Sequence, residues 1–385
     1  MTEMAYRLES QARPGQHIEE LDTPVLLVDL DRMERNIARL QALADENAIK
    51  LRPHIKTHKV PAIARLQLGA GAKGIACAKI AEAEVFADAG FDDIVVAYPV
   101  FGAEKWRRLA ELAKRARIGV NVDSLEAVRG TAAAATEAGV TVGIWVDLDT
   151  GLHRGGVDHR DLEQIKRVAA AAASTAGTEL VGLTTHRQIF FAEIADMTPE
   201  QAGRDEVHRL VEIADQLRRA GTEVGEISAG GSIVYAGAAS APGITELRAG
   251  TYVFCDLMEL GLGVATWEQL ALTILCTVVS IRQPRGATVD GGSKTFSGDR
   301  GLVGSPVAGL EGLAIAVDRD IHLDRLTEEH GMAVLGEGES VRLGDKIRFY
   351  PTHACTAVNL SDQLIGYRGD TVEVVWPVLA RGKRT

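Results

Sequence analysis

Several features of secreted and membrane proteins are missing from this sequence. No apolar run approaches the roughly 20 residues that a membrane-spanning helix needs. Residues 1–20 are polar and contain no apolar core of a signal peptide. The four cysteines lie far apart and show no paired spacing, so we expect reduced thiols in a cytoplasmic protein. They are Cys77, Cys255, Cys276 and Cys355.

Basic residues are also in short supply. The chain has 42 lysines and arginines against 53 aspartates and glutamates, which gives a net charge of -11. A surface this acidic repels phosphate backbones, so neither nucleic acids nor anionic membranes are expected as partners. The 46% of hydrophobic and 25% of charged residues are ordinary for a soluble globular protein, and 385 residues suit two domains or a barrel with an attachment.

Short apolar runs alternate with amphipathic segments over residues 30–262. After a first run at Val25–Asp29, eight further candidate strands follow, and helical patterns separate most of them. This alternation is typical of a (β/α)8 barrel in an α/β protein. A doubly wound open sheet is the alternative, although no glycine-rich dinucleotide motif follows the first strand. The eight strands are residues 51–55, 74–78, 94–98, 118–122, 142–147, 180–184, 224–228 and 246–249, and the clearest helices are residues 80–89, 103–116, 124–138 and 200–220.

The pattern changes after residue 262. Short candidate strands lie between turns rich in glycine and proline, and long helical periodicity is absent. We therefore expect a smaller, C-terminal β domain of residues 1–29 and 263–385, with which the isolated first strand, Val25–Asp29, can pair. Its other strands are expected at residues 270–281, 288–290, 313–317, 333–335, 346–349 and 371–375.

A basic cluster follows the first expected barrel strand. Residues 51–59 read LRPHIKTHK and contain His54, Lys56, His58 and Lys59. Barrel enzymes carry their active sites at the C-terminal ends of the strands. Neighbouring positive charge disfavours the ammonium form of a lysine, and a neutral amine is what Schiff-base chemistry requires. A basic surface loop that binds an anion explains the same residues equally well.

Three other segments follow expected barrel strands. Residues 147–157 (DLDTGLHRGGV) carry Arg154 among glycines, which let a guanidinium lie close to a ligand, although exposed arginines are common in such turns. Residues 227–232 (ISAGGS) offer backbone N–H groups and hydroxyls to a phosphate. His186 follows the expected strand at 180–184 and is either a functional residue or a hydrogen-bonded structural one.

His353 and Cys355 lie two positions apart in the segment PTHAC. On an extended segment, their side chains point to the same face. An imidazole and a thiolate can share a cation, and the thiolate favours a softer metal such as zinc. Two protein ligands leave positions open for water or substrate, as in a catalytic metal site. A buried thiol beside an ordinary histidine is the alternative.

Together these motifs resemble the fold-type III pyridoxal-phosphate family, and within it the branch of the D-threonine aldolases and D-serine dehydratases. The resemblance covers nearly the whole chain, from DTPVLLVD at residues 22–29 to the final β domain. It is carried by RPHIKTHK, DTGLHRGGV and PTHAC, and by three longer segments. These are GIACAKIAEAEVFADAGFDDI at residues 74–94, ELRAGTYVF at residues 246–254 and DGGSKTFSGD at residues 290–299.

The resemblance implies a role for each candidate residue. Lys56 is expected to hold pyridoxal 5'-phosphate (PLP) as a Schiff base, with Arg154 beside the pyridoxal ring and His186 as a second catalytic residue. His353 and Cys355 are expected to bind a divalent metal, which is zinc, manganese or magnesium. The family also implies a homodimer whose active site lies near the subunit interface. The remaining cofactor-binding residues implied by the resemblance are Ser228, Gly230, Gly231, Ser232 and Tyr252.

The implied activity is that of a PLP- and metal-dependent lyase. A D-threonine aldolase-like enzyme cleaves a D-β-hydroxy amino acid into glycine and an aldehyde. The alternative, a dehydratase of D-serine or 3-hydroxy-D-aspartate, uses the same residues. The motif set as a whole favours the aldolase, whereas Cys355 favours the dehydratase, because many aldolases of this branch have aspartate there. An amino-acid racemase and a non-catalytic PLP carrier are less favoured: the racemase motif is missing, and such carriers consist of the barrel alone.

The chain departs from the family pattern around His186. Members of the family usually have Tyr-His-Gly, often with a further histidine soon after, whereas residues 185–188 here read Thr-His-Arg-Gln. No second histidine follows nearby. The departure leaves the reaction and the substrate side chain open, and Arg187 could contact an acidic substrate.

Overall fold

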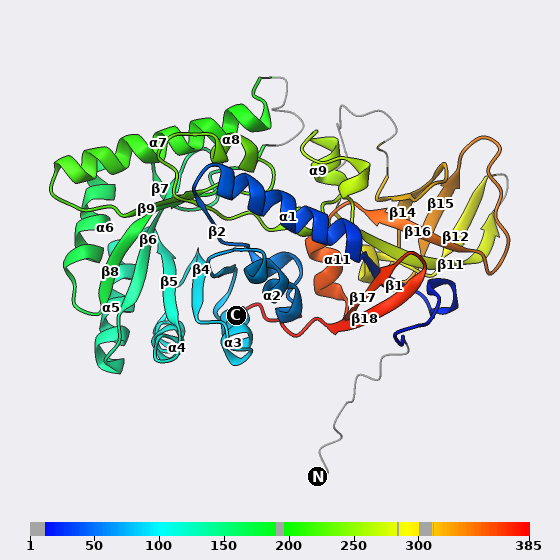
Figure 1. Cartoon of the computed structure of the whole chain (residues 1–385), viewed down its shortest axis with the longest axis horizontal. Helices are drawn as coiled ribbons and strands as arrows, with labels where there is room; N and C mark the ends of the chain where they lie inside the picture. Colours follow the sequence, from blue (N-terminus) through cyan, green and yellow to red (C-terminus); the bar gives the residue numbers. More distant parts are fainter. Residues whose placement is uncertain (1–11, 190–195, 283–284, 300–309, 311) are drawn as a thin grey trace, which may run out of the picture. The chain divides into compact units, whose positions relative to one another are not determined.

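A computed structural model describes residues 12–189, 196–282, 285–299, 310 and 312–385 (Figure 1). The predicted fold class, a parallel barrel with a second β domain, is confirmed. The predicted domain bounds at residues 29/30 and 262/263 stay predictions. The chain divides into two compact units: unit 1 comprises Met1–Asn36, Thr57–Val60 and Val253–Gly382, and unit 2 comprises Ile37–Lys56, Pro61–Tyr252 and Lys383–Thr385.

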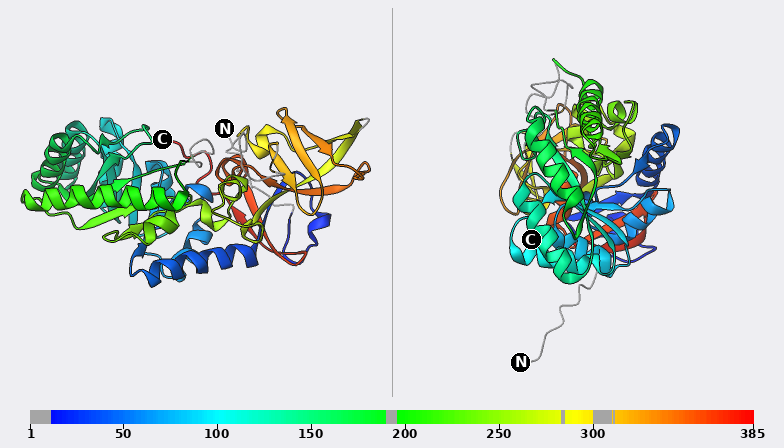
Figure 2. Two further views of the ribbon diagram at one scale, coloured as in Figure 1. Left: turned by 90° about the horizontal axis from the view of Figure 1, so that it is seen from above. Right: turned by 90° about the vertical axis from the view of Figure 1, so that its left-hand side faces the viewer.

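The parallel strands of unit 2 form the barrel (Figures 1 and 2). They follow the order β2-β10-β9-β8-β6-β5-β4-β3, and the short β7 (Val157–Asp158) pairs with β6. A bridge between His54 and Ala76 links the two ends of this order and closes the barrel. The strands are β2 (Lys50–Leu51), β3 (Ile75–Cys77), β4 (Asp93–Pro99), β5 (Arg117–Val122), β6 (Val142–Asp149), β8 (Thr178–Thr185), β9 (Glu226–Ala229) and β10 (Glu246–Leu247).

Helices follow the strands in the order expected from the sequence, and their ends have local causes. The Ser124 hydroxyl accepts a hydrogen bond from the Ala127 N–H at the start of α5, and Gly139 ends that helix with φ of 69°. Thr198 and Gln201 form a capping box at the start of α7. These helices are α1 (Leu30–Glu46), α2 (Pro61–Gly69), α3 (Ile80–Asp88), α4 (Ala103–Ala113), α5 (Leu125–Ala138), α6 (Leu162–Ser174), α7 (Pro199–Arg219) and α8 (Tyr235–Ala239).

The barrel interior contains a buried ion-pair network. The Arg52 guanidinium donates to Glu246 Oε2 at 2.8 Å and to Asp93 Oδ1 at 2.6 Å. The other oxygen of Glu246 accepts a hydrogen bond from the Ser228 hydroxyl at 2.7 Å. Because Arg52, Glu246 and Ser228 are all buried, these contacts compensate for the loss of hydration of two charged groups.

Unit 1 contains a predominantly antiparallel sheet in the order β12-β15-β14-β13-β16-β11-β1-β17-β18. An additional pairing of β12 with β11 closes six of these strands into a ring. The first strand of the chain, β1, pairs antiparallel with β11 and parallel with β17. The strands are β1 (Val25–Asp29), β11 (Leu272–Arg282), β12 (Gly286–Val289), β13 (Ala314–Ala316), β14 (Ile321–Leu326), β15 (Gly331–Leu335), β16 (Lys346–Pro351), β17 (Gln363–Arg368) and β18 (Thr371–Pro377).

Three short helices complete unit 1, and one of them corrects a prediction. They are α9 (Leu257–Gly261), α10 (Ser293–Phe296) and α11 (Ala354–Leu360). The expected extended segment at 353–355 is wrong, because α11 begins there: His353 is its N-cap in an extended conformation and Cys355 lies in its first turn. Buried Asp256 accepts the Ala354 N–H at 3.0 Å, which satisfies one of the free donors of this helix. Within the described ranges, no helix is both long and apolar enough to cross a bilayer.

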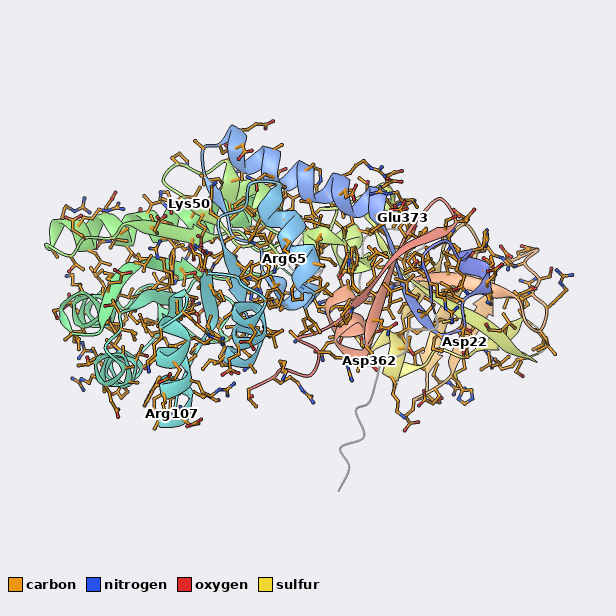
Figure 3. All side chains as sticks on the ribbon, turned by 60° about the horizontal axis from the view of Figure 1, so that its bottom comes forward. Asp22, Lys50, Arg65, Arg107, Asp362 and Glu373 are labelled. Atoms are coloured by element: carbon orange, nitrogen blue, oxygen red, sulfur yellow. The ribbon has the colours of Figure 1, made fainter. Side chains whose placement is uncertain are left out.

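The ion-pair network predicts a large effect of one substitution. We expect Arg52→Ala to lower the free energy of unfolding by about 3 kcal/mol or more, because it leaves the Glu246 carboxylate buried without its cation. Urea unfolding followed by circular dichroism measures the change. The matched control is Arg107→Ala on α4, an exposed arginine paired with Glu104 and labelled in Figure 3, for which we expect an unchanged midpoint. Equal midpoints for the two variants would contradict the role of the network.

Candidate active site

Lys56 lies just beyond the point where the barrel closes. Strand β2 ends at Leu51, His54 bridges to Ala76 of β3, and Lys56 follows in a 3-10 turn at Ile55–Thr57. The side chain of Lys56 is half-buried. The Lys56 backbone N–H donates to His54 Nδ1 at 3.4 Å, so the turn that carries the lysine also fixes the histidine.

Positive charge gathers around two imidazoles at this end of the barrel. Burial lowers the pKa of His54 well below its ordinary value, and the charges of Lys56, Arg248 and Arg154 lower it further. Burial and the same three cations also lower the pKa of His186. The structure therefore brings Lys56, Arg154 and His186 together, and both imidazoles are neutral at neutral pH.

Arg248 is a site residue that the sequence analysis did not single out. Its Nη2 donates to the Thr184 hydroxyl and to the Thr185 carbonyl oxygen, which is 3.2 Å away. Its buried Nε and Nη1 have no hydrogen-bond acceptor among the described residues. Burial lowers the pKa of Arg248. Its only signal in the sequence was its place inside the ELRAGTYVF segment.

Asp147 at the end of β6 is a second residue that was missed. Burial raises the pKa of its carboxyl to about 6, although the Arg248 charge and a hydrogen bond from Asn121 oppose the shift. Asp147 opens the DLDTGLHRGGV segment at 147–157, in which only Arg154 was expected to be functional. Because burial outweighs the opposing positive charges, this carboxyl titrates closer to neutral pH than an exposed aspartate does.

The loop after β9 forms a cradle of backbone. Gly230 adopts φ of 77°, a left-handed conformation that glycine allows without strain. A Cβ at Gly231 would lie 2.8 Å from His186 Cε1, so only glycine permits this close approach to the imidazole. The backbone N–H groups of Gly231, Ser232 and Ile233 have no acceptor within the described part of the chain. Three consecutive free donors make a potential anion site.

The predicted serines and tyrosine have structural partners in this region. The Ser228 hydroxyl is buried and donates to Glu246. Ser232 Oγ accepts the backbone N–H groups of Gly250 at 3.0 Å and Tyr252 at 3.3 Å. The Tyr252 side chain is 1% exposed, and its hydroxyl accepts from the Gln67 amide at 2.9 Å. Tyr252 therefore contributes to this loop through its backbone rather than through its ring.

Arg154 lies in an exposed loop whose backbone is bound by Asp149. Asp149 at the end of β6 accepts the backbone N–H groups of Gly151 at 2.9 Å and His153 at 3.0 Å. The His153 ring also contacts Asp149 at 2.9 Å. These contacts fix the path of the loop while the Arg154 side chain itself stays exposed.

His353 and Cys355 lie together in unit 1. A hydrogen bond joins the His353 ring to Cys355, and His353 Nδ1 is 2.9 Å from Asp299 Oδ2. The Thr57 hydroxyl is 3.2 Å from Cys355 Sγ. Burial opposes the charged form of His353, but the negative charges of Cys355 and Asp299 raise its pKa to about 11.

Two buried carboxylates surround this pair and were not identified from the sequence. Asp256 is 2% exposed, and its two oxygens accept N–H groups from the first turns of α9 and α11. Glu259 is 4% exposed, and its Oε1 has no partner among the described residues. Burial raises the pKa of both carboxyls. Across the described ranges, no group of three or more histidine, cysteine or acidic side chains could hold a metal ion, so the pair supplies two ligands at most.

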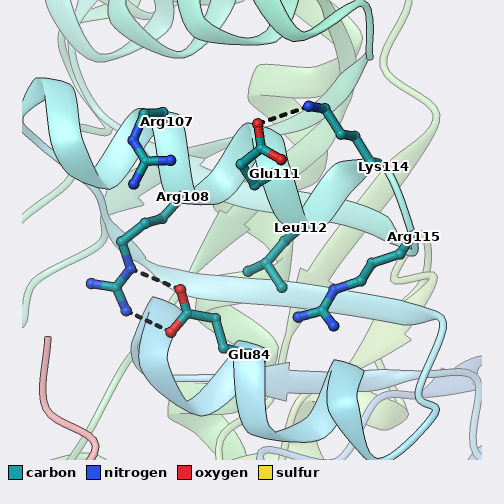
Figure 4. A pocket seen from close by; sticks show the side chains of 7 residues that line it. All are labelled: Glu84, Arg107, Arg108, Glu111, Leu112, Lys114 and Arg115. Carbon is teal, nitrogen blue, oxygen red and sulfur yellow. Dashed lines mark hydrogen bonds and ion pairs between the residues drawn. The ribbon is translucent and has the colours of Figure 1, made fainter.

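A separate pocket on the outside of the barrel contains none of these residues (Figure 4). It lies between α3 and α4, and its cations are already paired: Arg108 with Glu84 at 2.7 Å and Lys114 with Glu111 at 2.8 Å. We interpret it as a solvated ion-pair surface rather than a ligand site. Its lining residues are Glu84, Arg107, Arg108, Glu111, Leu112, Lys114 and Arg115.

Comparison with known proteins agrees with this arrangement. A family model described as alanine racemase, N-terminal domain, matches residues 28–257, and one described as putative serine dehydratase domain matches residues 271–367. The D-threonine aldolase of Arthrobacter sp. is 32% identical over 97% of this chain and 97% of its own. The chain belongs to the fold-type III PLP enzymes, in the branch of the D-threonine aldolases and D-serine dehydratases.

Two further relatives of this PLP family have solved structures. The D-threonine aldolase from Filomicrobium marinum has a TM-score of 0.85 at 32% identity, covering 97% of this chain and 100% of that chain. The D-threo-3-hydroxyaspartate dehydratase of Delftia sp. (strain HT23) is 33% identical over 87% of this chain and 91% of its own. A cysteine-to-alanine mutant of that dehydratase in the metal-free form has a TM-score of 0.84 at 30% identity, covering 94% of this chain and 98% of that chain.

The residues of unit 2 fit PLP. The cofactor carries a phosphate and a ring phenolate, and unit 2 offers three free backbone N–H groups in the 231–233 loop. Arg248 adds two unpartnered guanidinium nitrogens. The close contact of Gly231 with His186 leaves room for the loop backbone but not for a side chain. Lys56 provides the amine that the aldehyde of the cofactor requires.

The donor set of unit 1 fits a divalent metal. Metal-binding histidines commonly donate one ring N–H to a carboxylate, and Asp299 occupies that position at His353 Nδ1. The His353 ring and the Cys355 side chain share a hydrogen bond, so a cation could replace the proton between them. The resulting imidazole–thiolate pair leaves room for water or substrate in the coordination sphere.

The neutral imidazoles predict a pH dependence of stability. Histidine titrates near pH 6.5 in the unfolded chain, whereas His186 stays neutral to lower pH in the folded barrel. The unfolded chain therefore binds more protons below this pH, and stability falls as the pH falls. We expect His186→Asn to reduce the loss of unfolding free energy between pH 7 and pH 5 by about 1–2 kcal/mol in the cofactor-free protein.

Denaturant unfolding at each pH measures this effect. The control is His208→Asn, since His208 is exposed on α7, with 71% of its side chain accessible. We expect this control to follow the pH dependence of the wild type. Parallel curves for His186→Asn and the wild type would show that His186 is not held neutral in the fold.

Proposed function

We propose that the protein is a PLP- and divalent-metal-dependent lyase that cleaves D-β-hydroxy amino acids into glycine and an aldehyde. One observation carries this proposal: Lys56, His186 and the 230–232 loop lie together at one end of the barrel. The family resemblance assigns the Schiff base to Lys56 and the phosphate to the loop. The aldolases and the dehydratase described above support the same class of reaction.

The cationic end of the barrel suits the binding step. When bound, PLP withdraws electron density from the α-carbon of an amino acid. Lys56 supplies the amine that holds the cofactor, and Arg154 and Arg248 provide positive charge for its anionic groups or for the substrate carboxylate. The backbone N–H groups of Gly231 and Ser232 would bind the phosphate group of PLP. The Ser228 hydroxyl donates to Glu246 and so holds the start of this loop.

His186 is the second proposed catalytic residue. Its imidazole is neutral because of burial and the nearby cations, so it can accept a proton at neutral pH. In aldol cleavage, the β-hydroxyl of the substrate loses its proton as the bond between the α- and β-carbons breaks. We assign this proton to His186 because its ring borders the 230–232 loop.

His353 and Cys355 are proposed to bind zinc, manganese or magnesium. A metal bound by these two residues would supply a Lewis acid for a substrate hydroxyl. The Asp299 carboxylate supports the metal-binding tautomer of His353, and the Thr57 hydroxyl lies against the Cys355 sulfur. The existence of a metal-free form of the Delftia dehydratase supports a metal in this branch.

A dehydratase of D-serine or 3-hydroxy-D-aspartate is the second candidate. In that reaction, Lys56 would take the α-proton of the substrate, and a metal on His353 and Cys355 would supply Lewis-acid assistance to the departing hydroxyl. Cys355 favours it, and the Delftia relative is such an enzyme. Arg187 does not favour an acidic substrate, because its guanidinium already pairs with Asp205 at 2.8 Å.

The setting of the enzyme is also proposed. Four cysteines without a disulfide, three of them buried, suit the reducing cytoplasm. The family resemblance supports a homodimer whose active site lies near the subunit interface. Small D-amino acids are the proposed substrates, and we propose no nucleic-acid or membrane partner.

A substrate panel tests the reaction. We expect D-threonine or another D-β-hydroxy amino acid to give glycine and an aldehyde, and the L-enantiomers to give neither. Chelation should lower the rate by more than about tenfold, and added manganese or zinc should restore it, because the metal stabilises charge on the reacting oxygen. Ammonia and a keto acid as the products would favour the dehydratase instead. An unchanged rate after chelation would contradict the metal assignment of His353 and Cys355.

A lysine substitution tests the cofactor assignment. We expect Lys56→Ala to lose the yellow absorbance of lysine-bound PLP, because the covalent link is removed. Lys59→Ala is the comparison: Lys59 is buried and its Nζ lies 3.5 Å from the Ala380 carbonyl oxygen, so its absorbance should persist. Absorbance retained in the first variant and lost in the second would move the assignment to Lys59.

A further inference from the structure

Helix α7 lies unusually close to α8, the helix that follows the phosphate loop (Figure 1). A Cβ at Gly203 would lie 2.2 Å from the Val234 carbonyl oxygen, and a Cβ at Gly237 would lie 1.9 Å from the Glu200 carbonyl oxygen. The two glycines therefore let the two backbones touch. This close approach brings the next turn of α7 to the loop itself.

That turn carries Glu206, a fully buried carboxylate with two backbone donors. Its Oε1 accepts the Gly230 N–H at 2.9 Å, and its Oε2 accepts the Arg187 N–H at 3.2 Å. One side chain thus joins the loop after β9 to the segment after β8. Glu206 is 0% exposed, and burial raises the pKa of its carboxyl to about 8. Because no water reaches this site, each N–H would lose its hydrogen bond if the carboxyl group moved away.

The two joined segments also touch each other at the proposed site. Gly231 packs against the His186 ring, where a Cβ would lie 2.8 Å from Cε1. Glu206 holds the residue after His186 and the residue before Gly231. The carboxylate therefore fixes both sides of this contact, and with it the direction of the free N–H groups that follow Gly230.

Arg187 extends the same constraint to the loop of Arg154. Its Nη1 donates to Asp205 Oδ2 at 2.8 Å and to the Thr150 carbonyl oxygen at 3.2 Å. Asp205 precedes Glu206 on α7, and Thr150 lies in the loop that follows β6. Arg187, which stands where members of the family usually have glycine, thus links α7 to the loop after β6.

We propose that Glu206 is a positioning residue that fixes the 230–232 loop and the His186 segment relative to each other, and so sets the affinity of the site for the phosphate end of the cofactor. This inference rests on the proposed function, in which that loop binds the PLP phosphate. Both oxygens of the Glu206 carboxyl group accept an N–H, whereas a glutamine can offer only one acceptor oxygen to the two N–H groups.

The test compares PLP with pyridoxal, which has the same ring and aldehyde but no phosphate. Cofactor-free wild type and Glu206→Gln are titrated with each compound, and binding is followed by absorbance. We expect the PLP dissociation constant of Glu206→Gln to rise roughly tenfold or more, whereas that for pyridoxal changes little. The preference for PLP over pyridoxal should therefore fall by about the same factor. The matched control is Glu212→Gln, an exposed glutamate on the same helix, which should keep the wild-type preference.

The outcomes separate this inference from the proposed function. A wild type that binds no PLP would overturn the proposed function itself. A wild type that binds PLP, with an unchanged preference in Glu206→Gln, would overturn only the inference. Equal weakening of PLP and pyridoxal would also overturn it, since that result indicates a general structural role.

A measurement on the wild type covers the case in which Glu206→Gln does not fold. Hydrogen exchange is followed in the peptides that contain residues 186–188 and 230–233, with PLP or with pyridoxal bound. We expect the additional protection by PLP to appear in both peptides, because Glu206 couples their backbones. Additional protection confined to the 230–233 peptide would overturn the coupling.

Discussion

Glu246 accepts hydrogen bonds from Arg52 and Ser228, and all three residues lie on chain segments that lead into the proposed site. Arg52 approaches from the end of β2 and Ser228 from β9, while Glu246 itself begins β10. Each of these strands continues into a segment of the site: the turn of Lys56, the phosphate loop and the segment of Arg248. A buried carboxylate with an arginine partner is costly to desolvate, and its geometry is correspondingly specific. The relative positions of these three segments therefore depend on the Arg52–Glu246 ion pair.

The two units have opposite electrostatic characters at their proposed sites. In unit 2, burial keeps two imidazoles neutral, with a further contribution from Lys56, Arg154 and Arg248, and two guanidinium nitrogens of Arg248 have no partner among the described residues. In unit 1, the Cys355 sulfur and the Asp299 carboxylate hold His353 in its charged form. A phosphate-bearing cofactor suits the first environment and a divalent cation suits the second. The different charges around the two sets of side chains are therefore consistent with the proposed roles of the two units.

Much of the barrel could be predicted from the sequence because its strands are short, apolar and regularly separated by helices. The strand pattern does not reveal β14 or β17, since polar and charged residues interrupt the apolar alternation of these strands. The start of α11 was also missed, because Asp256, which accepts the Ala354 N–H there, lies 98 positions earlier in the chain. Glu206 and Asp256 show the same limit: each acts through backbone groups of remote loops, and no local motif marks such a role. Lys56, Arg154 and His186 were accessible because each follows a predicted strand at the functional end of a barrel.

The position of β1 has a consequence for synthesis of the chain. This apolar strand, VLLVD, lies between β11 and β17 in the sheet of unit 1. Its partners begin at Leu272 and Gln363, after the complete barrel has been translated. During translation, β1 stays unpaired in its sheet until β11 has been synthesised, which is after more than half of the chain. Such a segment can pair wrongly with other chains, so protection of β1 by chaperones or by slow release becomes part of making this enzyme.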